Sequence, residues 1–275
     1  MKFLISYGLP TIFPVSVRVL TLYVAFLYAK GYKESTVRNI LSAISFVLKI
    51  NNSIDNTKNF VLKRMLKGMK NRSTISPKLL PINLQLLNQI ILKISFANIP
   101  NYKRVLLKAV LLLTYYGCFR IGEVVMSAHD QHTLSIDNIS LLSNADEKVS
   151  LLIKLDSYKH ANSPVSFIIK PLDNKLFCPV VAVLEYLKLR SFSHGSFFLM
   201  QNNVPVKREF IASSLKKYVS ILGLNPKRYN THSLRIGRAT DLAVLGLPEQ
   251  VIKKAGRWES DAYLKYIRFD LFTMP

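Results

Sequence analysis

Residues 256–268 read Gly-Arg-Trp-Glu-Ser-Asp-Ala-Tyr-Leu-Lys-Tyr-Ile-Arg, and this stretch decides how the chain is interpreted. It contains Trp258, the only tryptophan, followed by Tyr263 and Tyr266, which are three positions apart. Aromatic residues at helical spacing are ordinarily buried in a core. A tyrosine hydroxyl also acts as a nucleophile when cationic or basic side chains activate it. A catalytic interpretation of 256–268 therefore requires such side chains elsewhere in the chain.

Residues 231–235, Thr-His-Ser-Leu-Arg, contain two side chains that are basic or cationic, His232 and Arg235. A segment with helical periodicity follows, and Thr231 or Ser233 is predicted to cap it. His232 and Arg235 are three positions apart and so share one face at the helix N-terminus. Free N–H groups and the helix dipole attract a phosphate there, and an imidazole and a guanidinium add further donors. The alternative is a capped helix with ordinary surface polar residues.

Residues 117–123, Gly-Cys-Phe-Arg-Ile-Gly-Glu, form a third cluster at the end of an apolar segment that predicts a buried helix over 105–116. Arg120 and Glu123 lie three positions apart next to apolar residues. By themselves they are somewhat more consistent with a structural ion pair than with a functional site.

In this order and at these distances, the three clusters resemble those of the tyrosine recombinase family. Arg120 matches the first family arginine, with Glu123 at the accompanying acidic position. His232 and Arg235 match the His-x-x-Arg box of that family. Trp258 matches a later position that is His in phage integrases and Trp in Cre-like enzymes.

Tyr266, within Tyr-Ile-Arg, matches the nucleophile of the family, and Tyr263 remains the alternative nucleophile. Lys159, in the Ser-Tyr-Lys-His run at 157–160, matches the catalytic lysine on a predicted β-hairpin. The resemblance extends over about 100–275 and is closest to the recombinases of DIRS-like and Ngaro-like retrotransposons and of cryptons.

The resemblance implies a site-specific DNA recombinase that cuts and rejoins DNA through a covalent 3′-phosphotyrosine. Arg120 and Arg235 would stabilise the negative charge on the non-bridging oxygens in the transition state. His232 would accept the tyrosine proton, and Lys159 would protonate the leaving 5′-oxygen. Trp258 would donate its indole N–H, and Glu123 would orient its neighbours. No cofactor is implied, and no metal site is expected because the histidines and acids show no ligand spacing.

The charge of the chain predicts a polyanionic partner. The 275 residues include 38 Lys and Arg against 16 Asp and Glu, a formal net charge of +22. Nucleic acid is the leading candidate, because lysines and arginines that neutralise phosphates release condensed counterions, and an anionic membrane surface is the rival. The resemblance implies that the nucleic acid is double-stranded DNA. The resemblance implies a homo-tetramer on synapsed DNA and a monomer or dimer otherwise. A basic helical adaptor on RNA or at a membrane is the rival class, but it gives no account of the three clusters.

The expected fold class is mainly α with a small antiparallel β-sheet, in the two-domain tyrosine recombinase architecture. We predict a helical DNA core-binding domain over 1–72, a linker over 73–80, and a mixed α+β catalytic domain over 81–275, and the two domains are expected to clamp DNA. A helix over 57–70 should direct Phe60, Leu62, Met65 and Met69 inward. β-like runs at 151–155 and 165–169 predict the hairpin.

Basic residues are concentrated before position 80, where 13 Lys and Arg accompany 2 Asp and Glu. Those of the helix predicted over 57–70 and the residues just after it are expected to contact DNA: Lys63, Arg64, Lys67, Lys70 and Arg72.

The remaining composition indicates an ordered intracellular protein, nuclear if its host is eukaryotic. Hydrophobic residues make up 49% of the chain, which permits a sizeable core. The longest apolar run, 105–118, contains Lys108 and is shorter than the roughly 20 residues that span a bilayer, so no membrane partner is expected. Cys118 and Cys178 are 60 positions apart in apolar surroundings and predict buried free thiols.

Two further interpretations stay open beside the active recombinase. One is a DNA-binding protein of the same fold that has lost catalysis. The other is a type IB topoisomerase, which shares the chemistry, although the sequence clusters are nearer to those of the mobile-element recombinases.

Overall fold

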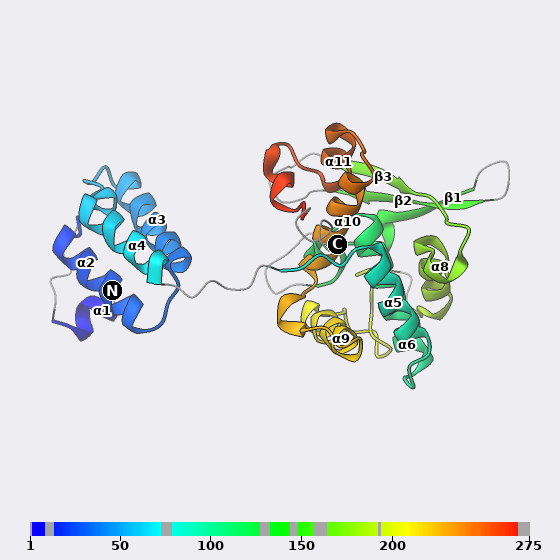
Figure 1. Ribbon diagram of the computed structural model, residues 1–275. Coiled ribbons are helices and arrows are strands. Elements are labelled where there is room, and N and C mark those ends of the chain that lie inside the picture. Colours follow the sequence, from blue (N-terminus) through cyan, green and yellow to red (C-terminus); the bar gives the residue numbers. More distant parts are fainter. Residues whose placement is uncertain are drawn as a thin grey trace, which may run out of the picture. The chain divides into compact units, whose positions relative to one another are not determined.

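The computed structural model describes residues 2–8, 14–72, 79–126, 133–143, 148–156, 164–191 and 194–268 (Figure 1). The chain divides into two compact units, Met1–Ser76 and Pro77–Pro275, and each is a separate structural body. The division falls inside the segment 73–80, for which the sequence predicts a linker.

The first unit is helical. It comprises α1 (Lys2–Ser6), α2 (Val17–Ala29), α3 (Glu34–Ile50), the short 3-10 helix η1 (Asn56–Lys58) and α4 (Phe60–Arg72). Ser16 caps α2 by accepting a hydrogen bond from the Val19 N–H. One apolar stripe from each long helix forms the core, with Leu20, Val24 and Leu27 from α2, Val37 and Leu41 from α3, and Leu62, Leu66 and Met69 from α4.

The predicted inward direction of Phe60 is wrong, because this side chain is 72% exposed. Helix α4 begins at Phe60 rather than at position 57, and the Asn59 side chain accepts a hydrogen bond from the Val61 N–H at 2.9 Å. At the first position of the helix, Phe60 lies off the buried stripe. Its ring instead contacts the guanidinium of Arg64, with Cζ 5.9 Å from the ring centroid.

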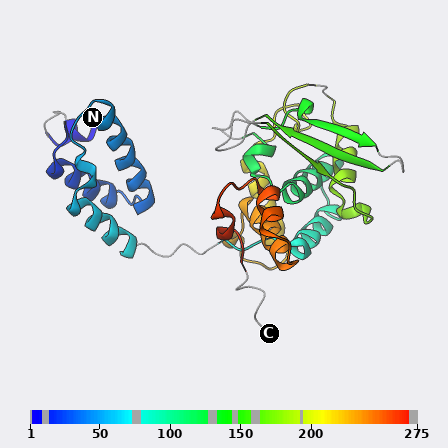
Figure 2. The same cartoon turned by 90° about the horizontal axis from the view of Figure 1, so that it is seen from above.

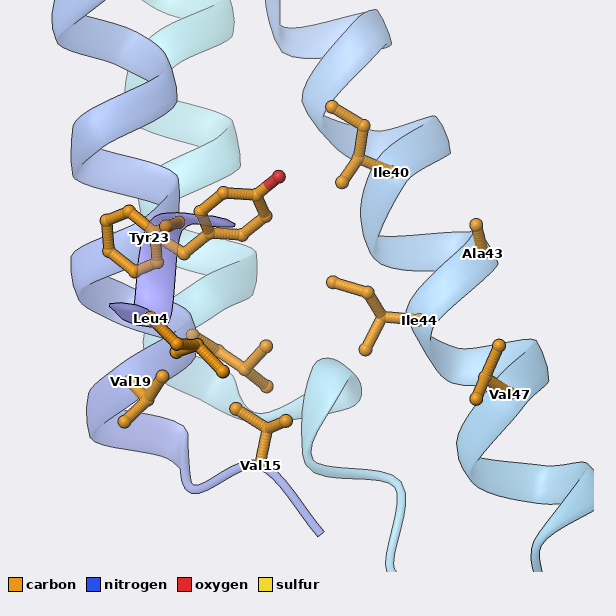
Figure 3. A pocket seen from close by; sticks show the side chains of 10 residues that line it. Leu4, Val15, Val19, Tyr23, Ile40, Ala43, Ile44 and Val47 are labelled. Atoms are coloured by element: carbon orange, nitrogen blue, oxygen red, sulfur yellow. The ribbon is translucent and has the colours of Figure 1, made fainter. Parts of the chain in front are cut away.

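A cavity of about 560 Å³ lies between α1, α2 and α3 of this unit (Figure 3). Apolar side chains line it, among them Leu4, Val19 and Ile44, and Tyr23 contributes the one polar side chain of the lining. A cavity with this apolar lining has few groups that could bind a charged ligand.

The second unit is built around a buried helix. Its helices are α5 (Leu84–Ser95), α6 (Asn101–Tyr116), α7 (Ile121–Val124), α8 (Pro179–Leu189), α9 (Arg208–Ile221), α10 (His232–Val244) and α11 (Glu249–Gly256). Every residue of α6 from Val105 to Tyr115 is buried, because α5, α8 and α10 pack around it. Short 3-10 helices η2 (Ile136–Asn138), η3 (Lys175–Phe177), η4 (Pro226–Arg228) and η5 (Asp261–Lys265) join the longer elements.

An antiparallel sheet lies along one side of these helices (Figures 1 and 2). Its strands β1 (Ile139–Ser143), β2 (Val149–Leu155) and β3 (Val165–Ile169) are ordered β1-β2-β3, and Ile153 of β2 pairs with Ile139 and Phe167. Leu151, Ile153 and Leu155 are buried at alternate positions. The predicted fold class, mainly α with a small antiparallel sheet, is therefore confirmed.

Two smaller predictions concern the apolar residues. Cys118 and Cys178 are both free and buried, as their surroundings indicate. No helix within the described part of the chain combines the length and the apolar character needed to cross a bilayer.

Candidate active site

The start of α10 carries two predicted site residues. The helix begins at His232, and Asn230 caps it by accepting a hydrogen bond from the His232 N–H at 2.8 Å. Neither Thr231 nor Ser233 provides the predicted cap; the Ser233 hydroxyl accepts from the Asn230 N–H at 3.1 Å instead. The three-residue spacing places the side chains of His232 and Arg235 on the same face of α10.

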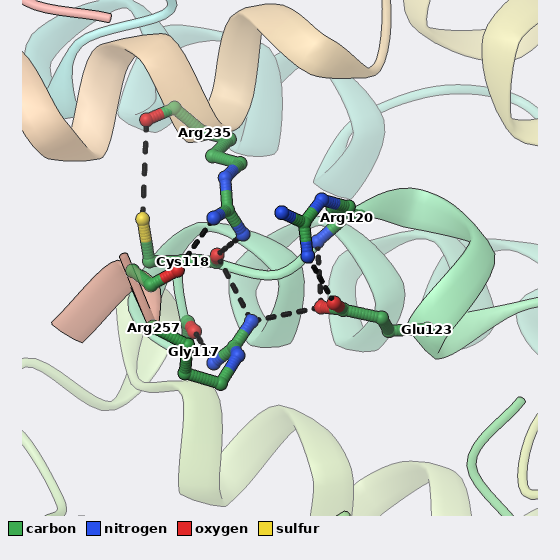
Figure 4. A network of polar contacts seen from close by, with 7 residues as sticks. Gly117, Cys118, Arg120, Glu123, Arg235 and Arg257 are labelled. Atoms are coloured by element: carbon green, nitrogen blue, oxygen red, sulfur yellow. Dashed lines mark hydrogen bonds and ion pairs between the residues drawn. The ribbon is translucent and has the colours of Figure 1, made fainter. Parts of the chain in front are cut away.

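Arg235 is fully buried, at 0% exposure. Its Nη1 donates to the carbonyl of Cys118 at 2.6 Å, and its Nη2 donates to the carbonyl of Gly256 at 2.5 Å (Figure 4). Its buried Nε–H has no hydrogen-bond partner among the described residues. Arg235 thus joins the end of α6 to the end of α11.

The carboxylate of Glu123 lies between two guanidinium groups (Figure 4). Its Oε1 pairs with Nη1 of Arg120 at 3.0 Å, and its Oε2 pairs with Nη2 of Arg257 at 2.8 Å. The Arg120 backbone N–H also donates to Oε2, at 2.9 Å. The side chain of Arg120 remains 26% exposed, whereas that of Arg257 is 3% exposed. Arg120 is therefore fixed at one edge and still open to solvent.

Three side chains surround the ring of Tyr266. The ring centroids of His232 and Trp258 lie 5.1 and 4.9 Å from that of Tyr266. The Cζ atom of Arg235 lies 5.5 Å from the Tyr266 centroid and 4.5 Å from the centroid of Trp258. The rings of Trp258 and Tyr266 thus lie against the buried Arg235 guanidinium.

Trp258 is itself 8% exposed, and its Nε1–H is buried without a hydrogen-bond partner among the described residues. Gly256 makes room for its ring, since a Cβ at position 256 would come within 1.8 Å of it. Tyr263 is buried and contacts Trp258, with ring centroids 6.4 Å apart, and the Lys253 Nζ atom lies 5.4 Å from the Tyr263 ring. Tyr263 shows no ring contact with His232 among the described residues.

The pKa of His232 is lowered to about 4. Burial is the main cause, and the positive charges of Arg235, Arg120, Arg208 and Arg268 add to it. The imidazole is therefore neutral near pH 7, with one ring nitrogen unprotonated, and it is a weaker base than an ordinary histidine.

The structure brings together Arg120, Glu123, His232, Arg235, Trp258 and Tyr266 from three distant parts of the sequence. Lys159 falls in 157–163, outside the described residues. The five basic residues predicted to contact DNA, Lys63, Arg64, Lys67, Lys70 and Arg72, are all exposed on α4 in the first unit. No cluster of three or more His, Cys, Asp and Glu suited to a metal ion is found among the residues that the structure describes.

Sequence reasoning missed Arg257, Arg208 and Arg268. Arg257 stands inside the quoted 256–268 stretch, but its partner Glu123 is far away in sequence, so no spacing indicates the pair. Arg208 opens α9, and Arg268 follows Tyr266. Both act on His232 through charge, and the sequence holds too many arginines for either to be singled out.

No protein-family model matches the sequence. No curated protein matches it either. Solved structures, in contrast, share its fold.

The XerH site-specific recombinase bound to difH substrate matches with a TM-score of 0.64 and 15% identity, covering 94% of this chain and 69% of that one. The Tn1549 transposon integrase in complex with circular intermediate DNA matches with a TM-score of 0.63 and 16% identity, covering 98% and 87%. A lambda integrase dimer bound to a COC′ core site matches with a TM-score of 0.59 and 11% identity, covering 98% and 70%. The chain therefore has the fold of the tyrosine recombinases and integrases.

Proposed function

We propose that the chain is a tyrosine recombinase, a DNA strand transferase that cuts and rejoins DNA through a covalent bond between Tyr266 and a 3′-phosphate. The observation that carries the proposal is the position of the Tyr266 ring, which lies against His232, Trp258 and Arg235 together. A proton acceptor, cationic donors and a phenol are the groups needed for metal-independent transesterification. The fold shared with recombinases and integrases supports the same conclusion.

The donors of the site suit a phosphoryl group. The exposed edge of Arg120 is available to a non-bridging oxygen. The buried N–H groups of Arg235 Nε and Trp258 Nε1 have no partner among the described residues, and an unpaired buried donor costs about 1–3 kcal/mol. An incoming phosphate oxygen would satisfy such donors. Where negative charge develops in the transition state, each well-placed donor is worth about 3 kcal/mol.

The proposed proton movements use His232 and Tyr266 of this site and Lys159, which the family resemblance assigns. His232, neutral near pH 7, accepts the Tyr266 hydroxyl proton as the phenol oxygen forms a bond to phosphorus. The bond from phosphorus to the 5′-oxygen breaks, and Lys159 supplies the proton to that oxygen. Attack by a 5′-hydroxyl on the phosphotyrosine reverses these steps. The energy of the broken bond is kept in the phosphotyrosine, so religation needs no nucleotide.

The geometry favours Tyr266 over Tyr263 as the nucleophile. Tyr266 lies beside His232, whereas Tyr263 packs on Trp258 and lies near Lys253. Trp258 orients Tyr266 and offers a donor, and Glu123 holds Arg120.

The partner we propose is double-stranded DNA, bound by a homo-tetramer when two sites are synapsed. The net charge of +22 and the exposed basic residues of α4 support DNA binding. The XerH, Tn1549 integrase and lambda integrase structures are all complexes with DNA. The sequence runs around Arg235 and Trp258 support a place among the mobile-element recombinases of the DIRS-like, Ngaro-like and crypton group.

A second candidate is a DNA-binding protein of this fold without strand cleavage. The burial of Arg235 favours it, because the rings of Trp258 and Tyr266 lie against the guanidinium that should bind the phosphate. In an active enzyme, the rings of Trp258 and Tyr266 must therefore move when DNA binds. In a protein that binds DNA without cutting it, the rings can stay where they are.

The test is a search for a covalent adduct that does not require the target site to be known. The protein is incubated without divalent metal with a library of nicked duplexes, in which cleavage next to the nick releases a short fragment and prevents religation. Denaturing gels then separate protein joined to DNA, with Tyr266→Phe and Tyr263→Phe beside the wild type. We expect an adduct in the wild type and in Tyr263→Phe but none in Tyr266→Phe.

Loss of the adduct in Tyr263→Phe alone would overturn the assignment of the nucleophile and keep the enzyme. Salt-sensitive DNA binding without any adduct would favour the second candidate, a DNA-binding protein of this fold without strand cleavage.

A further inference from the structure

Arg257 has a backbone conformation that an arginine rarely adopts. It ends α11 with φ 55° and ψ 47°, in the left-handed region. Helices commonly end in this conformation, but with glycine, which has no Cβ to clash with the backbone. An arginine in this position is disfavoured by its backbone, so the interactions of its side chain must compensate.

The side chain of Arg257 is buried among groups of the α6–α7 segment. Its Nη1 donates to the carbonyl of Gly117 at 3.1 Å, and its Nη2 donates to the carbonyl of Cys118 at 3.3 Å and to Glu123 at 2.8 Å. Its Cζ atom also lies 4.9 Å from the ring centroid of Phe119 and 5.4 Å from that of Phe167. Charge, hydrogen bonds and aromatic faces thus hold the guanidinium in one place.

Arg257 has one contact in common with each of the arginines proposed to bind phosphate. It shares the carboxylate of Glu123 with Arg120, and it shares the carbonyl of Cys118 with Arg235. Arg257 also precedes Trp258 directly in the chain. A substitution at Arg257 therefore alters the surroundings of Arg120, Arg235 and Trp258 together.

We propose that Arg257 is a positioning residue that fixes Arg120 through Glu123 for phosphate binding, an inference that rests on the proposed strand-transfer function. Without the pair to Arg257, the carboxylate of Glu123 has, among the described residues, only Arg120 as a partner, and Arg120 is the residue that it should orient. Arg120 is part-exposed, so its direction toward a phosphate depends on that carboxylate being fixed from the other side. Groups that orient the ligands of a metal ion typically matter by 10- to about 100-fold in affinity or activity, and we expect an effect of similar size here.

The experiment uses Arg257→Gly and Arg257→Lys in the full chain. The glycine variant removes the guanidinium and at the same time relieves the left-handed backbone, which favours a folded protein. The lysine variant keeps the charge but cannot reach two carbonyls and a carboxylate with a planar fork. Arg190→Ala is the matched control, because Arg190 also donates to backbone carbonyls, those of His194, Ser196 and Phe197, away from the site.

Two readouts are compared with the melting temperature of each variant. The first is the rate of adduct formation on saturating nicked DNA. We expect it to fall about 10- to 100-fold in both Arg257 variants, to recover partly in Arg257→Gly when free guanidinium is added, and to change little in Arg190→Ala. The second is amide hydrogen exchange at Arg120, whose N–H donates to Glu123 at 2.9 Å. We expect about 10-fold faster exchange in Arg257→Gly relative to amides of α6, and no such change in Arg190→Ala.

An unchanged adduct rate, or a slower rate with unchanged Arg120 exchange, would overturn the positioning role. So would an equal loss in Arg190→Ala at equal melting temperature. If the wild type forms no adduct, the proposed function fails, and the exchange at Arg120 still decides whether Arg257 orders that segment.

Discussion

The imidazole ring of His232 lies beside the phenol ring of Tyr266, with their centroids 5.1 Å apart. The two residues come from the first position of α10 and from the turn after η5. The hydroxyl of Thr240, farther along α10, lies 2.8 Å from the Ile236 carbonyl and 3.2 Å from the Tyr266 carbonyl, and its single proton is shared between these two acceptors. The tyrosine thus contacts α10 with both its backbone and its ring.

The depressed pKa of His232 predicts a specific pH dependence of stability. The ordinary pKa of 6.5 is lowered to about 4 in the folded chain, so the unfolded chain binds a proton first as the pH falls. The free energy of unfolding should therefore fall between about pH 7 and pH 4, with a slope of at most roughly 1.4 kcal/mol for each step of one in pH. Urea unfolding of the wild type and of His232→Gln over this range checks it. The two pH profiles should differ, and identical profiles would contradict the buried neutral imidazole.

The two tyrosines should differ in their effect on stability. Tyr263 is buried against Trp258, so Tyr263→Ala should lower the free energy of unfolding by about 3 kcal/mol. The Tyr266 hydroxyl has no hydrogen bond within the described residues, so Tyr266→Phe should change stability by no more than about 0.5 kcal/mol. Denaturant titration measures both. A large loss in Tyr266→Phe would show that this hydroxyl supports the fold.

Trp258 should report the arrival of DNA at the site. It is the only tryptophan, and it lies 4.9 Å from Tyr266 and 4.5 Å from the Arg235 guanidinium. A phosphate that reaches Arg235 has to displace these rings, which should change the intensity or wavelength of tryptophan emission. Fluorescence titration with duplex DNA tests this, with Trp258→Phe as the blank. Tight DNA binding with unchanged emission would mean that Arg235 stays covered.

The basic face of α4 should set part of the salt dependence of DNA binding. Lys63 and Lys67 are exposed one turn apart, and each phosphate contact contributes about 0.9 to the slope of log K against log salt. Replacing both by Gln should therefore reduce the slope by about 2. The matched pair Lys30→Gln and Lys58→Gln, on other elements of the same unit, should reduce it less. Equal effects of the two pairs would argue against α4 as the DNA-contacting helix.

Gly256 should tolerate no side chain. The Cβ of Gly256→Ala would lie within 1.8 Å of the Trp258 ring, and overpacking of this kind costs about 1–3 kcal/mol. The variant should lose stability and should also shift the tryptophan emission. Gly68→Ala is the contrast, because nothing lies within 4 Å of a Cβ there and alanine favours a helix by about 1 kcal/mol. Normal emission in Gly256→Ala would contradict the packing of Trp258.

The sequence predicts the fold class and the helices over 57–70, over 105–116 and after 231–235, because the apolar periodicity of each reflects the side that it buries. Strand β1 was not predicted as a separate strand, since its residues are mostly exposed and carry no alternation of burial. The cap of α10 was assigned to Thr231 or Ser233, but the turn before the helix brings Asn230 to the His232 N–H instead. Local rules of this kind depend on backbone angles that the sequence leaves open.

The site residues were predicted as three separate clusters, and the pairing between clusters was not. Arg120 and Glu123 are neighbours in the sequence, so their ion pair could be anticipated. The pair of Glu123 with Arg257 depends on how α11 ends against the α6–α7 segment. Arg235 illustrates the same limit, because its partners are carbonyl groups, which every residue has.

Those carbonyl partners affect how relatives of this protein should be interpreted. Arg235 joins Cys118 to Gly256, so natural selection would retain it for folding even in a lineage that no longer cut DNA. The rings of His232 and Tyr266, in contrast, carry no side-chain hydrogen bond within the described residues. In a set of homologues, a conserved Arg235 would therefore say little about activity. Replacement of His232 or Tyr266 beside an intact Arg235 would mark the descendants in which only DNA binding survives.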